Sequence, residues 1–210
     1  MKLSPSCSSA RCRPAPLCFL LASSLAFCLA LPSRAEAQGT HFIAEAELGV
    51  AMPMGAELDE AGMGIGATFG FGGKVPGTFV RGYLLAQANF SQFSINRCGV
   101  QGLDRHVTDT ALGARMLIPL FDSIRVFGDV LLASAWVSSQ ELDSAGMRYW
   151  IEDADPRMAA IFSAGIQFRP MSLLSLGARA DFLTLLDQTE LPEGEVEGRV
   201  SFLGSVSLHF

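Results

Sequence analysis

The residues of this sequence that could do chemistry are arginines and carboxylates that recur at alternate positions of apolar segments. Glu45 and Glu47 flank an alanine, and so do Arg179 and Asp181. Alternate residues of a strand point to one face, and guanidinium groups bind carboxylates in pairs where space is confined. The sequence therefore predicts a network of ion pairs on one face of a sheet. Its predicted members are Glu45, Glu47, Arg81, Asp109, Arg115, Arg125, Asp129, Arg157, Arg179, Asp181 and Arg199.

No other motif in the chain predicts catalysis, a cofactor or a metal. The sequence contains no G-x-G-x-x-G, P-loop, G-x-S-x-G or H-E-x-x-H pattern. The three histidines are scattered. If the first and last strands pair, His41 and His209 both face inward at one rim; we interpret them as a pair bonded to water, with a metal site as the alternative. We predict no enzyme and no cofactor.

Acidic residues gather between the alternating segments. The interpretation we favour is solubility and repulsion of neighbouring molecules, and divalent-cation binding is the alternative. The acidic residues in question are Glu57, Asp59, Glu60, Glu141, Asp143, Glu152, Asp153, Asp155, Asp187, Glu190, Glu193, Glu195 and Glu197.

Eight alternating segments position these charges, and each is longer than the five or six residues typical of globular strands. About 9–11 residues suffice for a tilted strand to cross a hydrocarbon layer. The predicted strands are His41–Met52, Gly62–Gly72, Thr78–Phe90, Val107–Ile118, Ile124–Val137, Arg157–Arg169, Leu173–Thr184 and Gly198–Phe210. Their connections alternate between long and short, as in a barrel threaded through a membrane from one side. We therefore predict an all-β fold, an eight-stranded antiparallel up-and-down transmembrane β-barrel.

The front of the chain is typical of a secretory signal peptide. Lys2, Arg11 and Arg13 precede an apolar stretch, and a small-x-small site ends at Ala37. We predict a signal peptide at 1–37 and a barrel domain at 38–210. Four of the five cysteines would leave with the signal, so that Cys98 has no intramolecular partner. The remaining 11 basic and 20 acidic side chains give a net charge of −9, which excludes a nucleic-acid binder.

The last residues, FLGSVSLHF, alternate to the end of the chain. With the signal, the eight strands and the loop order, they resemble the small bacterial outer-membrane β-barrels of the OmpA/OmpX type, an eight-stranded porin-like family. The resemblance covers about residues 38–210. It implies that Phe202, Leu208 and Phe210 form the C-terminal signal read by the barrel-assembly machinery. It also implies a monomer in the bacterial outer membrane, in contact with outer-membrane lipid and lipopolysaccharide.

The expected function is that of an integral outer-membrane barrel with a plugged, ion-paired interior and acidic extracellular loops, acting in membrane integrity, adhesion or surface recognition. The near balance of inward acids and bases favours a plugged interior over an open pore. Three alternatives stay open: a narrow channel for small solutes, a lipid A-modifying enzyme and a soluble periplasmic lipocalin-like barrel. For the enzyme, His106 is the one histidine expected at the outer side, with Ser91, Ser94, Ser138 and Ser139 as candidate nucleophiles.

Overall fold

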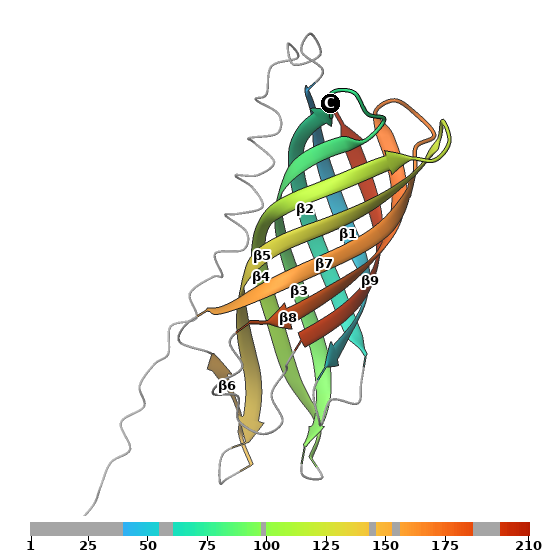
Figure 1. Cartoon of the computed structure of the whole chain (residues 1–210). Helices are drawn as coiled ribbons and strands as arrows, with labels where there is room; N and C mark the ends of the chain where they lie inside the picture. The colour runs from blue at the N-terminus through green and yellow to red at the C-terminus, as the bar shows by residue number, and fades with distance from the viewer. Residues whose placement is uncertain (1–39, 55–60, 98–99, 143–145, 153–155, 187–197) are drawn as a thin grey trace, which may run out of the picture. The chain divides into compact units, whose positions relative to one another are not determined.

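A computed structural model describes residues 40–54, 61–97, 100–142, 146–152, 156–186 and 198–210 of the chain. Their fold is nine antiparallel strands (Figure 1). The strands are β1 (Thr40–Met54), β2 (Gly62–Lys74), β3 (Arg81–Arg97), β4 (Val100–Pro119), β5 (Ile124–Leu142), β6 (Arg148–Glu152), β7 (Arg157–Phe168), β8 (Leu174–Leu185) and β9 (Gly198–His209). Eight of them close into a barrel, because β1 pairs with β9 and β4 pairs with β5. The predicted fold is confirmed. No helix in the described part of the chain is long and apolar enough to cross a membrane.

The strand predictions were incomplete in two respects: three strands are longer than predicted, and one short strand was not predicted. Strands β3, β4 and β5 extend well beyond their predicted ends, into segments expected to be loops. The short strand β6, inside the predicted third long loop, pairs with the far end of β5. Strands therefore continue past the length that a membrane requires, because neighbouring strands there still satisfy each other's main-chain hydrogen bonds.

The strands are tilted, and the tilt follows from the register. A walk from Arg81 through successive hydrogen-bonded partners passes Leu117, Phe127, Gly165, Arg179, Leu203, Gly49 and Gly64. It returns to β3 at Ser91, ten residues beyond its start. Each step to a neighbouring strand thus climbs by about 1.25 residues, ten residues over eight strands. Closure of a barrel requires a stagger of this kind.

The two faces of the wall differ in chemistry. Phe162, Leu176 and Val206 point outward, with 48%, 48% and 49% of their surface exposed, whereas Arg179 and Asp129 are buried inside at 3% and 2%. The apolar side chains therefore cover the outside of the barrel and the charges fill its axis. This arrangement is the reverse of a lipocalin-like barrel, whose inner face is apolar.

Glycine on β2 makes room for side chains of the interior. A Cβ at Gly66 would lie 2.4 Å from the Asn89 side-chain oxygen and 3.0 Å from a Glu47 carboxylate oxygen. A Cβ at Gly70 would lie 2.6 Å from the Leu85 side chain. The inner face of β2 has no side chain at these two glycines, and side chains of the neighbouring strands fill the space. No channel therefore runs beside this strand at these two positions.

Candidate functional site

Arg115 is the centre of the first group of charges inside the barrel. Its Nε and Nη2 donate to the two oxygens of Asp129 at 2.8 and 2.9 Å, and its Nη1 donates to Glu45 at 2.8 Å. The guanidinium carbon lies 4.1 Å from the centre of the Phe127 ring. Arg115 is 1% exposed. One arginine therefore neutralises carboxylates from two strands on opposite sides of the barrel, β1 and β5.

Arg179 continues the network toward the long loops. Its guanidinium lies 2.6 Å from Asp181, 3.0 Å from Glu47 and 4.0 Å from Asp129. Thr68 donates a further hydrogen bond to Glu47 at 2.8 Å. Because Asp129 is shared with Arg115, the two arginines belong to one connected group. Buried charges of this kind are tolerated only when they are paired.

Arg199 forms a second group. Its Nη1 donates to Asp109 at 2.7 Å and to the Ser91 hydroxyl at 2.9 Å. Asn89 donates to the other oxygen of Asp109 at 2.7 Å. These side chains come from β3, β4 and β9 and are 5% exposed or less. Hydrogen bonds therefore connect different strands across the interior at successive heights along its axis. They leave little room for solute to pass.

Not every predicted member lies in these groups. Arg81 and Arg125 lie at the end of the barrel that carries the short turns, apart from the ion pairs of the described residues. Arg157 begins β7 at the opposite end. The two groups therefore contain five carboxylates and three arginines. The sequence predicts the inward face of these basic residues and no height along the barrel axis.

Sequence reasoning missed the uncharged members of the interior. Gln167 and Ser207 both donate to Glu45, at 3.3 and 2.9 Å. Inward apolar side chains such as Phe127 and Leu131 pack between the charged groups. These polar residues occupy positions that the alternation of their strands places on the inner face. Serine and glutamine occur on either face of a strand, however, so their types indicate no partner.

At the long-loop end, His106 lies on the outer wall in an aromatic cluster. Its ring centroid is 5.1 Å from that of Phe90 and 4.5 Å from that of Trp150 on β6. Ser138 is its register partner on β5. Among the described contacts, no hydrogen bond joins the ring to the Ser138 hydroxyl, and His106 Nε2 is buried without a partner. The residues needed for a serine–histidine pair are adjacent, but their bond is not formed.

The other predicted sites divide between two parts of the chain. His209 contacts the Ser175 hydroxyl through its Nε2, and its main-chain nitrogen donates to Leu173 at 2.9 Å. No group of three or more potential metal ligands occurs among the described residues. The signal peptide, Cys98 and most acidic loop residues lie outside the described residues.

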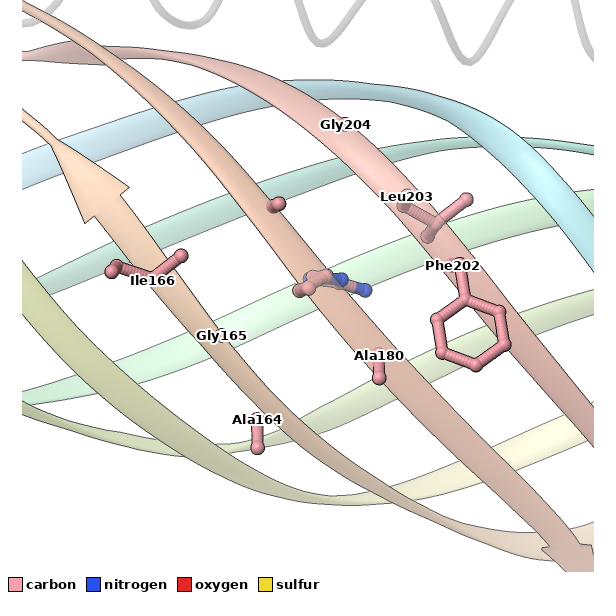
Figure 2. A pocket seen from close by; sticks show the side chains of 9 residues that line it. Ala164, Gly165, Ile166, Ala180, Phe202, Leu203 and Gly204 are labelled. Carbon is pink, nitrogen blue, oxygen red and sulfur yellow. The ribbon is translucent and has the colours of Figure 1, made fainter.

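A shallow hollow lies on the outer wall between β7, β8 and β9 (Figure 2). Its volume is about 570 Å³, and it is open to the outside. The space exists because the side chains of Ala164 and Ala180 are small and Gly204 has none. Ile166 and Phe202 lie at its edges. The lining is mostly apolar, and its one charged residue, Arg179, is paired with Asp181 inside the barrel. The hollow therefore belongs to the outer apolar wall.

No protein-family model and no curated protein matches this sequence. Several solved structures do match this chain. Ail, the attachment invasion locus protein of Yersinia pestis, was solved in complex with the heparin analogue sucrose octasulfate; it is 11% identical, with a TM-score of 0.51 over 82% of this chain and 99% of that one. Neisserial surface protein A is 11% identical, with a TM-score of 0.49 over 82% and 98%.

The outer-membrane enzyme PagL is 15% identical, with a TM-score of 0.45 over 79% of this chain and 97% of that one. PagL is described as an enzyme, and the name of Ail refers to attachment and invasion. Identities this low show architecture and not activity. The closed strand order, the apolar outer wall and the likeness to Ail agree on one conclusion: this chain has the fold of the small eight-stranded outer-membrane β-barrels.

Proposed function

We propose that this protein is an integral barrel of the bacterial outer membrane that does not conduct solutes and acts at the cell surface through its long-loop end. The observation that supports this most strongly is the contrast between the two faces of the wall. Large apolar side chains cover the outside, while Arg115, Arg179 and Arg199 are paired along the axis. A wall of this kind is stable in lipid, and eight strands enclose only enough space for side chains.

The surface role we propose is membrane integrity, adhesion or surface recognition. The long connections contain most of the acidic side chains of the predicted mature chain. Ail was solved with a sulfated, polyanionic ligand, but acidic loops repel such a ligand. We therefore infer that the partners of this chain are cationic surfaces or divalent cations that bridge to the phosphates of lipopolysaccharide.

Export, assembly and oligomeric state belong to the same proposal. We propose that residues 1–37 are removed as a signal peptide, that the barrel works as a monomer, and that the assembly machinery reads Phe202, Leu208 and Phe210. These three side chains point outward and are 53%, 45% and 53% exposed. The chain end is held in the sheet, because Phe42 and Phe210 exchange two main-chain hydrogen bonds of 2.9 Å.

We expect the folded protein to be recovered in the outer-membrane fraction, to migrate faster on gels before boiling than after, and to give no defined openings in planar bilayers. A closed barrel resists detergent at room temperature, and a paired interior blocks ions. Stepwise single-channel currents that survive in several preparations would contradict the plugged interior and favour the narrow channel. Recovery in the periplasm would contradict the membrane location.

The enzyme alternative is tested at His106 and Ser138. Because their side chains lack the hydrogen bond that activates a serine, we expect the mass of lipid A to be the same in cells with and without the protein. We also expect His106→Ala and Ser138→Ala cells to give that same mass spectrum. Loss of an acyl chain from lipid A in cells with the wild type, abolished by either substitution, would show that the protein is a hydrolase.

A further inference from the structure

Basic side chains gather inside the barrel at the end that carries the short turns. The register shows this directly. Phe127 lies two strands from Arg81 along the walk described above, and therefore about 2.5 residues higher; two residues below it on β5 is Arg125. By the same reasoning, two further residues lie at the level of Arg81. They are Arg169, four residues after Gly165, and His209, six residues after Leu203.

The electrostatic interactions of these residues agree with the register. Arg81 and Arg169 both repel Arg125, and all three arginines repel His209. Arg169 lies in the turn between β7 and β8, and its pKa is lowered, by burial and then by repulsion from Arg81. We call Arg81, Arg125, Arg169 and His209 the mouth ring. Figure 1 shows the chain end, marked C, beside the three short turns.

Little negative charge offsets the mouth ring. Among the described residues at this end, Asp122, in the turn between β4 and β5, is exposed. The C-terminal carboxylate accepts a hydrogen bond from the Phe42 amide at 2.9 Å. The nearest interior carboxylate, Glu45, is already bonded to Arg115, Gln167 and Ser207. The positive charge of the ring is therefore not neutralised by these groups.

The guanidinium groups of the ring also have donors to spare. Arg125 is 8% exposed, and its Nη1 is buried without a hydrogen-bond partner. Arg81 forms no hydrogen bond or ion pair with the described residues. Arg169 uses Nε and Nη2 on the turn carbonyls of Met171 and Ser172, which leaves Nη1. A buried, unpaired guanidinium is costly, and a bound anion would remove that cost.

We propose that the mouth ring is a binding site for a phosphate-type oxyanion, with Arg125 as the central ligand and Arg81 and Arg169 on either side. Planar guanidinium groups match the oxygens of a phosphate in pairs. The anion is either free phosphate from the solvent at this end or the headgroup of a phospholipid in the adjacent leaflet. This inference depends on the barrel and its register, and not on the role of the long loops.

The experiment uses the refolded barrel in an uncharged maltoside detergent, which contains no phosphate of its own. Inorganic phosphate is titrated by calorimetry at low salt, and a short-chain phosphatidylglycerol below its micellar concentration is titrated separately. We expect saturable binding of at least one of the two, weakened about tenfold by Arg125→Gln. Arg81→Gln, a half-buried position, gives a second test if Arg125→Gln fails to fold.

The matched control is Arg148→Gln on β6, which removes the same charge at the opposite end of the barrel. We expect it to leave the affinity unchanged. Binding of phosphate alone identifies a free anion as the ligand, and binding of the lipid alone identifies a headgroup. Absence of saturable binding of both probes, or equal weakening by Arg148→Gln, would overturn the proposal.

Discussion

Arg115→Ala is expected to lower the free energy of unfolding of the barrel by about 3–5 kcal/mol, the usual cost of removing one partner from a buried ion pair. Arg115 is the partner of both Glu45 and Asp129, and its side chain is fully buried. The substitution leaves two buried carboxylates without their shared guanidinium partner. Urea unfolding in lipid vesicles, followed by the fluorescence of Trp136 and Trp150, measures the change.

Three further variants separate charge from geometry. Arg115→Lys keeps the charge but loses the paired hydrogen bonds to Asp129, so an intermediate loss is expected. Arg115→Met combined with Glu45→Gln and Asp129→Asn removes all three charges and should recover part of the stability. Arg148→Ala, at an exposed position, should stay within about 0.5 kcal/mol of the wild type. Equal effects of Arg115→Ala and Arg148→Ala would show that the interior network contributes nothing to stability.

The architecture could be predicted from the sequence because the two faces of each strand have different surroundings, lipid on the outside and charged side chains on the inside. A barrel that separates lipid from a charged axis must alternate at every second residue, so segments such as Gly198–Phe210 show their phase without any knowledge of their neighbours. Strand β6 lacked this signal. Tyr149, Trp150 and Ile151 are consecutive and each more than 40% exposed, so no alternation marks the strand.

The partners of the interior charges could not be predicted in the same way. Alternation gives the face of a residue, but its height depends on the stagger that builds up around the barrel. Arg115 and Arg125 are close in sequence and share a face, yet Arg115 joins Glu45 and Asp129, while Arg125 lies at the short-turn mouth. Arg125 lies four residues from Asp129, the register partner of Arg115. Which residue across the barrel meets Arg115 depends on the ten-residue stagger of the closed barrel, which no single strand encodes.

The second large effect is expected on the outer wall. Leu112→Arg should destabilise the barrel by about 2–4 kcal/mol in a lipid bilayer, because a charge near the midplane of the hydrocarbon layer must be desolvated or must draw water inward. Leu112 is 69% exposed, and its register partner on β5, Leu132, is 61% exposed. Both lie on the lipid-facing side, about midway along their strands. Urea unfolding in vesicles again provides the measurement.

The matched control places the same residue where the headgroups and water are. Met171→Arg, in the turn between β7 and β8, is 66% exposed in the wild type and should cost about 0–1 kcal/mol. In a barrel surrounded by water the two substitutions would be equivalent, since an arginine on any exposed wall is hydrated, and Leu112→Arg would improve solubility. A difference between two equally exposed positions can therefore come only from the solvent that each one faces, which is the property that distinguishes a membrane barrel from a soluble one.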